Sequence, residues 1–140
     1  MPRRTVPTPS AYRTLAEFRY LIRCFLEFSE TAARDHGLPP RQHQALLAIK
    51  GFAGSNGPLI GELAERLRIA HHSAVELVDR LVESGLVQRQ ADANDRRRVR
   101  LRLTSAAEQK LLALSAVHLE ELRRLRPVLL AILDQVDDAR

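Results

Sequence analysis

The chain has 140 residues, of which 45% are hydrophobic and 28% charged, and its formal net charge is +5 at neutral pH. This length fits one domain that buries its core without a disulfide or metal staple, and a single cysteine excludes an internal disulfide framework and fits a reducing cytoplasm. Since no run of about 18 apolar residues exists and the basic N-terminus lacks the apolar segment of a secretory signal, we expect a cytoplasmic protein without a membrane span.

The N-terminal third predicts an arm followed by two helices. Residues 1–10 are dotted with proline and indicate a flexible arm. From Ala11 to about Asp35, apolar residues recur at three- and four-residue spacing, which is typical of a long amphipathic helix. Pro39-Pro40 then starts a second helix, which ends at the glycines that begin with Gly51.

Two short helices follow, joined by a short turn. The first covers about 59–67, the turn is Arg68-Ile69-Ala70, and the second ends at Gly85, which is suited to a helix C-terminus. Two short helices joined in this way form a helix-turn-helix pattern.

A basic hairpin comes next. Residues 86–90 can pair with residues 99–103 and leave an eight-residue tip over 91–98. In the second strand the apolar residues alternate with arginine, which predicts a half-buried strand whose outer surface carries Arg98, Arg100 and Arg102. Residues 86–104 hold six arginines and two aspartates, so they carry +4 of the chain's net +5. A concentrated guanidinium patch of this kind favours binding to phosphate.

The remaining sequence predicts a long C-terminal helix. Thr104 and Ser105 offer N-cap hydroxyls, and Ser105 with Glu108 has the spacing of a capping box. The helix runs to about Leu125, and Pro127 kinks it or restarts it.

The expected fold is mainly α, an α+β winged helix-turn-helix with a two-stranded wing and long helices at both ends. Within a single domain over 11–140, the DNA-binding part covers about 38–104, and the end helices cover about 11–36 and 105–138. The apolar faces of these end helices exceed what a small winged helix can cover, so we expect them to form a homodimer. A dimer also suits a helix-turn-helix protein that spans two half-sites.

Three stretches resemble the multiple-antibiotic-resistance regulator (MarR) family of winged-helix transcription factors. They are Ile60–Leu67, Ser73–Leu81 continuing to Gly85-Leu86-Val87, and, most specifically, Asp95–Thr104. The resemblance extends from about Tyr12 to Leu133. It implies a homodimer, a DNA-reading helix, a wing in the minor groove and often a small-ligand pocket between the dimer and DNA-binding regions.

The chain departs from the family pattern at two positions. Ala70 stands where a hydroxyl residue usually opens the recognition helix, and Ala107 stands where glycine usually follows the Leu-Thr pair. The first departure leaves the helix N-terminus without its own side-chain cap. The free amides of the first turn would then interact with a DNA phosphate or with His72.

The second helix of the helix-turn-helix carries the expected major-groove contacts. With Val75, Val78 and Val82 turned inward, the opposite face carries Ser73, Glu76, Leu77 and Arg80, with His72 at its edge. Ser73 could serve a base or a phosphate, Arg80 a guanine or a phosphate, and Leu77 a thymine methyl. Glu76 either accepts from cytosine or forms an i,i+4 ion pair with Arg80.

The wing tip carries the expected minor-groove contacts. By family resemblance, Asp95 buttresses the loop while Arg97, flanked by Arg96 and Arg98, enters the narrow groove. A narrow A/T-rich groove focuses negative potential, which favours an inserted guanidinium. The alternative is a solvated run of charges at a hairpin tip.

Two further residues have open interpretations. Cys24 lies in the first helix, where peroxide-sensing relatives place a reactive cysteine, but it also fits a small core residue. His43 is either a ligand contact at the interdomain cleft or a satisfied buried histidine. The five histidines have no metal-ligand spacing, so we expect neither a metal nor a cofactor.

The sequence therefore predicts a homodimeric repressor that binds a pseudo-palindromic duplex operator and is released by a small molecule. Two other functions stay open: a winged-helix module that binds a protein partner without reading DNA, and a redox-sensing regulator based on Cys24. An enzyme is not expected, because the chain has no glycine-rich phosphate loop and no nucleophile matched with a base.

Overall fold

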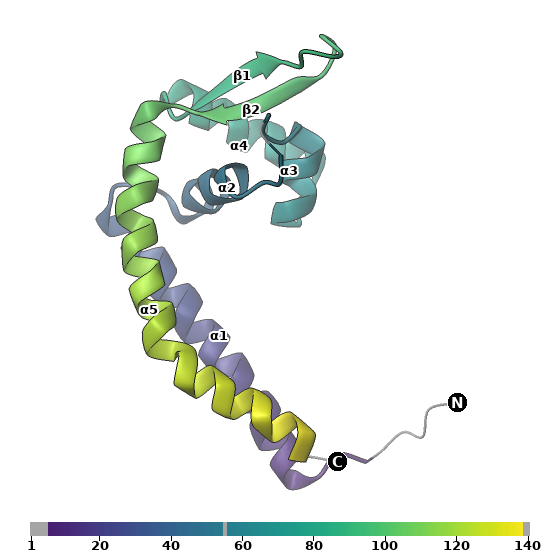
Figure 1. The fold of residues 1–140 in the computed structure, drawn as a ribbon, viewed down its shortest axis with the longest axis vertical. Coiled ribbons are helices and arrows are strands. Elements are labelled where there is room, and N and C mark those ends of the chain that lie inside the picture. The colour runs from purple at the N-terminus through teal and green to yellow at the C-terminus, as the bar shows by residue number, and fades with distance from the viewer. Residues whose placement is uncertain (1–5, 55, 139–140) are drawn as a thin grey trace. The chain divides into compact units, whose positions relative to one another are not determined.

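The structure is a computed structural model that describes residues 6–54 and 56–138. In chain order its elements are α1 (Pro9–Asp35), α2 (Pro40–Lys50), α3 (Ile60–Leu67), α4 (His71–Glu83), β1 (Val87–Ala91), β2 (Val99–Leu103) and α5 (Ser105–Asp138) (Figure 1). A mainly helical chain with one two-stranded antiparallel sheet confirms the predicted winged-helix fold class. None of the described helices is long and apolar enough to cross a membrane.

The chain divides into two compact units. The winged unit comprises residues 32–115, and the terminal-helix unit comprises the residues up to Thr31 together with those from Ala116 onward. The predicted arm over 1–10 lies partly outside the described residues, and α1 already starts at Pro9.

The winged unit is built around a continuous apolar core. Every helix and strand of this unit contributes to it, so that helix-turn-helix and wing share one interior. The burial of a large aliphatic side chain contributes about 1.5–3 kcal/mol, which makes this core the main source of stability for the unit. Its largest fully buried side chains include Leu46, Leu63, Val78, Leu81, Leu101 and Leu114.

The wing is supported on both edges of β2. β1 pairs with β2 in antiparallel register from Val87↔Leu103 to Ala91↔Val99. On the other edge, an isolated bridge joins Leu59 to Arg100, and the Leu101 N–H donates to the Pro58 carbonyl at 2.9 Å. The segment that leads into α3 therefore runs beside β2 and is joined to it by this bridge and hydrogen bond.

The start of α5 uses one of the two predicted N-cap hydroxyls and lacks the predicted capping box. Thr104, not Ser105, occupies the N-cap: its Oγ1 accepts from the Ala107 N–H at 3.3 Å and donates to the Gly85 carbonyl at 2.7 Å. Glu108 serves no capping box, because its carboxylate lies 2.9 Å from Lys50 Nζ. A hydroxyl caps a helix only from the residue before its first turn, and α5 begins at Ser105.

Two other expectations differ in detail. α5 continues through Pro127, so the alternative in which the helix restarts there is wrong. β1 extends one residue further than expected, which shortens the hairpin tip to residues 92–98.

The terminal-helix unit pairs α1 with the second part of α5. The His118 ring stands edge-on to Phe25 and Phe28, with centroids 6.1 and 5.6 Å away, and His118 Nε2 lies 2.8 Å from Ser29 Oγ. These helices nevertheless leave a set of large apolar side chains exposed. They are Tyr12, Leu15, Phe18, Tyr20, Ile22, Leu26, Leu119, Leu122, Val128, Leu130, Leu133 and Val136.

We predict that Gly57→Ala destabilises the winged unit. Gly57 has φ +76°, and a Cβ there would lie 2.1 Å from the Leu101 carbonyl oxygen. The left-handed backbone and the clash together should lower the free energy of unfolding by about 2–4 kcal/mol, measured by urea denaturation followed by circular dichroism. Gly61→Ala is the matched control, because its Cβ meets nothing within 4 Å and alanine favours α3. Equal stability of both variants and the parent chain would contradict the requirement for glycine at position 57.

Candidate nucleic-acid interface

Helix α4 presents an exposed face whose charge is mainly acidic. Its buried residues are Ala74, Val78 and Leu81, at i, i+4 and i+7. Glu76, Asp79 and Glu83 are exposed against a single arginine, Arg80, and no ion pair joins Glu76 to Arg80 in the described structure. Asp79 instead pairs with Arg89 of β1. The exposed positions of the helix are His71, His72, Glu76, Asp79, Arg80 and Glu83.

The buried stripe of α4 is rotated from the predicted one. Ala74 and Leu81 are fully buried, whereas Val75 and Val82 are only partly so. Leu77, which was expected to face the groove, is partly buried and packs against the core, and Ser73 is also partly buried. The small Ala74 allows the helix to approach its neighbours closely at that point, an effect that a pattern of large apolar residues does not reveal.

The N-terminus of α4 has no side-chain cap, as Ala70 at the N-cap position leads one to expect. Ala70 is extended, with φ −64° and ψ 151°, and makes no side-chain hydrogen bond. The first-turn amides of such a helix carry partial positive charge and suit an anion. His71 and His72 stand exposed in this turn.

The turn between α3 and α4 contains a left-handed arginine. Arg68 has φ 56°, the Arg68 N–H donates to the Glu65 carbonyl, and the Ile69 N–H donates to the Ala64 carbonyl, each at 3.1 Å. This is a Schellman closure, in which glycine usually occupies the left-handed position. An arginine there costs about 1–2 kcal/mol of backbone energy.

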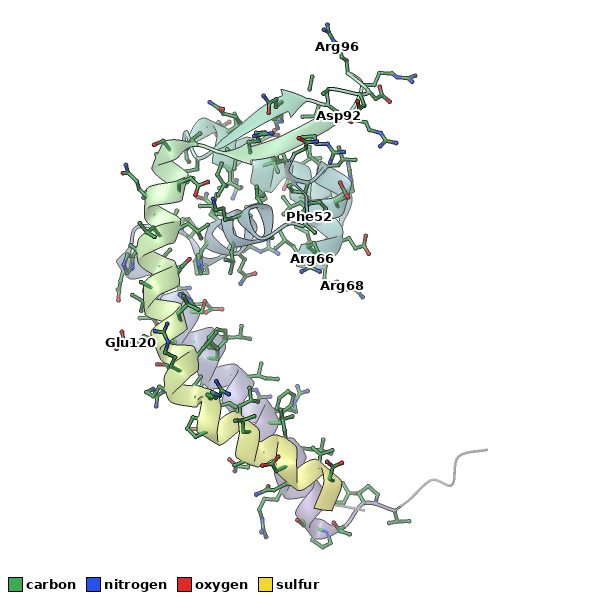
Figure 2. All side chains as sticks on the ribbon, in the orientation of Figure 1. Phe52, Arg66, Arg68, Asp92, Arg96 and Glu120 are labelled. Carbon is green, nitrogen blue, oxygen red and sulfur yellow. The ribbon has the colours of Figure 1, made fainter. Side chains whose placement is uncertain are left out.

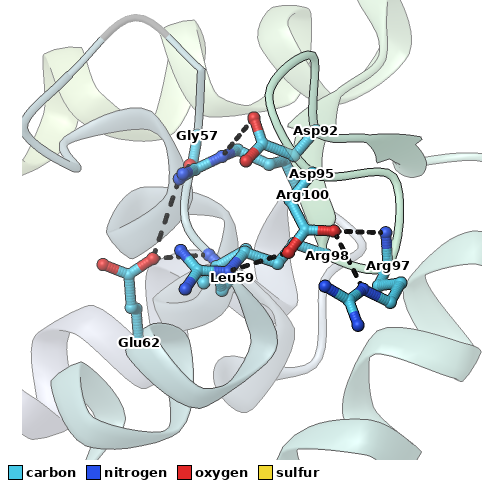
Figure 3. A network of polar contacts seen from close by, with 8 residues as sticks. All are labelled: Gly57, Leu59, Glu62, Asp92, Asp95, Arg97, Arg98 and Arg100. Carbon is cyan, nitrogen blue, oxygen red and sulfur yellow. Dashed lines mark hydrogen bonds and ion pairs between the residues drawn. The ribbon is translucent and has the colours of Figure 1, made fainter.

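The wing tip is organised by Asp95. Its Oδ1 accepts from the Arg97 backbone N–H at 3.1 Å and from Arg97 Nε at 3.3 Å, and its Oδ2 lies 4.0 Å from Arg98 Nε (Figure 3). The Arg98 N–H also donates to the Asp95 carbonyl, and the Asp92 N–H donates to the Arg98 carbonyl. The carboxylate thus shapes the loop from its centre.

The arginines of the tip point into solvent. The Arg97 side chain is 93% exposed and that of Arg98 is 60% exposed. Figure 2 shows Arg96 at the outer end of the hairpin. The geometry places three guanidinium groups on a short braced loop, where they are available to a polyanion.

Arg100 does not share the expected cationic outer face of β2. Its side chain is only 22% exposed and lies between Glu62 and Asp92, while Arg102 is exposed. On the other side of the strand Leu101 is fully buried, but Val99 is 36% exposed. Successive side chains therefore alternate between the two faces of β2, as predicted. The exposure of each side chain does not follow this alternation, because Arg100 is partly buried and Val99 is exposed. No feature of the sequence links Glu62 and Asp92 to Arg100.

The other predicted site residues lie in less accessible positions. His43 is buried on α2, with 3% exposure. Cys24 is partly buried on α1, and a hydrogen bond with its side chain raises the pKa of the Tyr20 hydroxyl. The described residues contain no group of three or more His, Cys, Asp or Glu that could hold a metal ion.

Comparisons with known proteins agree with the family resemblance. A model described as MarR family matches residues 36–98. AbsC, a MarR family transcriptional regulator from Streptomyces coelicolor, superposes with a TM-score of 0.74 at 19% identity, over 96% of this chain and 92% of that chain.

Two further solved structures with the same fold carry bound molecules. CouR from Rhodococcus jostii, bound to p-coumaroyl-CoA, has a TM-score of 0.68 at 22% identity, over 84% of this chain and 85% of that chain. A mutant of S. aureus MepR bound to an oligodeoxyribonucleotide has a TM-score of 0.66 at 18% identity, over 89% of this chain and 97% of that chain. At such identities the likeness concerns the fold. The MarR resemblance of the sequence is confirmed over residues 36–98, and the fold agrees over most of the chain.

Proposed function

We propose that this MarR-type chain is a sequence-specific DNA-binding transcriptional regulator that acts as a homodimeric repressor. The observation that carries the proposal is the wing tip, where Asp95 braces a loop with three exposed arginines. This tip and α4 belong to the same winged unit, so one rigid core presents both to a duplex. The MepR mutant with the same fold is bound to an oligodeoxyribonucleotide, which supports the proposal.

The two elements would divide the work of recognition. Exposed carboxylates on α4 oppose phosphate, so affinity would come mainly from the wing and from the uncapped α4 N-terminus. Base reading would fall to the exposed residues of α4, with Arg80 to guanine and Glu76 to a cytosine amino group. Leu77 and Ser73, which are partly buried, would contribute less than Arg80.

A second copy of the chain is the proposed cover for the terminal-helix unit. Its exposed apolar side chains include Leu15 at 58% and Ile22 at 40% exposure. A soluble monomer rarely leaves so many large apolar side chains exposed together, and a two-fold dimer would bury them while presenting two winged units to two half-sites.

A small-molecule effector is the last part of the proposal. CouR, which has the same fold, is bound to p-coumaroyl-CoA. Loss of DNA binding on addition of compounds from a small-molecule library is the measurement that would reveal such an effector here. If no compound changes DNA binding, the effector part of the proposal is wrong.

We predict salt-sensitive binding to duplex DNA. If each dimer makes about 6–10 phosphate contacts, affinity should fall roughly 10³–10⁵-fold between about 50 and 200 mM salt, because bound arginines release counterions from the duplex. Fluorescence anisotropy with a labelled duplex measures this directly. A flat salt response, or no binding at all, would favour a winged-helix module that binds a protein partner.

We predict different effects from the wing and the recognition helix. Arg97→Ala should weaken binding to many sequences, most strongly at A/T-rich flanks, because it removes a minor-groove cation. Arg80→Ala should instead relax the preference for particular bases, by about 1–3 kcal/mol if a bidentate guanine contact is lost. Selection from a randomised duplex library separates the two outcomes. Unchanged affinity of Arg97→Ala on every probe would remove the wing from the interface.

We predict that charge on α1 breaks the dimer. The double variant Leu15→Glu/Ile22→Glu places carboxylates in the proposed interface and should yield a monomer in light scattering, because burial of unpaired charges is strongly unfavourable. Leu112→Glu is the control, since Leu112 is 75% exposed but belongs to the winged unit. A well-folded dimer of the double variant would refute this interface.

A further inference from the structure

We propose that Arg100 is a positioning residue that fixes the wing against the helix-turn-helix and thereby decides where Arg96, Arg97 and Arg98 meet DNA. It would do so without contacting DNA itself. The inference rests on the proposed function and adds a residue outside the predicted DNA contacts.

The contacts of Arg100 join three parts of the winged unit. Its Nη1 donates to the Gly57 carbonyl at 2.9 Å and lies 3.8 Å from Glu62 Oε1 on α3. Its Nε lies 3.5 Å from Asp92 Oδ1, at the start of the wing tip (Figure 3). One guanidinium from β2 therefore connects the tip both to the segment before α3 and to α3 itself.

The surroundings of Arg100 argue against a direct phosphate contact. The single positive charge lies beside two carboxylates, Glu62 and Asp92, so the cluster as a whole is negative. Asp92 is 7% exposed, and Arg100 Nε is buried without a hydrogen-bond partner. The charge of a guanidinium held in this way is already paired with carboxylates of the protein, so it attracts a polyanion only weakly.

Arg100 is more buried than Arg89, which forms the exposed ion pair between β1 and α4. That pair, Arg89 with Asp79, has side chains 37% and 51% exposed, so solvent and salt screen it. The Arg100–Asp92 pair is exposed by only 22% and 7% and is screened much less. Arg100 therefore connects the base of the tip, through this buried pair with Asp92, to the segment before α3, through its hydrogen bond to the Gly57 carbonyl.

The tip needs such support because its own bonds are local. A two-stranded hairpin is marginal alone, and the hydrogen bonds within residues 92–98 join only Asp92 to Arg98 and Asp95 to Arg97 or Arg98. Asp92 is bonded to Arg98 through its backbone and paired with Arg100 through its carboxylate. A loss of Arg100 would free the base of the loop that carries the three arginines.

A double-mutant cycle on DNA binding tests the proposal. Arg100→Gln is compared with Arg102→Gln, which removes the same charge from an exposed position of the same strand. On an A/T-rich synthetic duplex, Arg100→Gln should lose as much affinity as Arg97→Ala, and the addition of Arg97→Ala to Arg100→Gln should cost less than about a twofold further loss. With Arg102→Gln, the effect of Arg97→Ala should persist in full. Full persistence in the Arg100→Gln background as well, or equal effects of the two glutamine variants, would overturn the proposal.

Hydrogen exchange provides a readout that needs no DNA. In the full chain, Arg100→Gln should accelerate exchange of the Asp92 and Arg98 amides, which are hydrogen-bonded within the tip, while the amides of Val78 and Leu81 in α4 keep their protection. Asp92→Asn should have the same effect and serves as the second variant if Arg100→Gln does not fold. Unchanged exchange at the tip in the folded variant would overturn the proposal. If the parent chain binds no duplex, the proposed function fails while exchange still decides the role of Arg100.

Discussion

The backbone at Leu101 is the constraint on which the winged unit depends. Its N–H donates to the Pro58 carbonyl, its own carbonyl stands where any side chain at position 57 would have to go, and its side chain is fully buried in the core. β2 is thus held on one edge by β1 and on the other by the segment before α3. A hairpin that would be marginal alone becomes part of the same packed body as the helix-turn-helix.

The elements of the fold were predictable because each has a local physical cause. The predicted helix bounds agree with the structure within a few residues. They come from apolar residues at helical spacing, from Pro39-Pro40 at a helix start and from Gly85 at a helix end. The strand over 99–103 agrees fully, because alternation over five residues has no helical counterpart. Both kinds of signal depend on neighbours in the chain and need no knowledge of tertiary contacts.

The missed features all depend on contacts between residues far apart in the sequence. In the sequence Arg100 has the same predicted position as Arg98 and Arg102, on the outer face of the strand. Alternation predicts the direction of a side chain but not its contacts with distant carboxylates such as those of Glu62 and Asp92. Leu77 packs against the core instead of facing outward, because the buried stripe of α4 includes Ala74, whose small side chain gives no strong apolar signal in the sequence. Thr104 and Ser105 carry the same local capping signal, and only contacts such as that of Thr104 with the Gly85 carbonyl separate them.

The carboxylate of Glu62 has one partner within its own helix start and another in the wing. Its Oε1 accepts from the Leu59 N–H at 2.9 Å, which closes the first turn of α3, and the same oxygen faces Arg100. Glutamine at this position could keep the first role and would lose the charge of the second; aspartate would be too short to keep both. In the course of evolution, positions 62, 92 and 100 should therefore change together rather than singly. A lineage that replaces Arg100 with an apolar residue would be expected to neutralise Asp92 as well, and comparison of divergent relatives at these three columns would show whether it does.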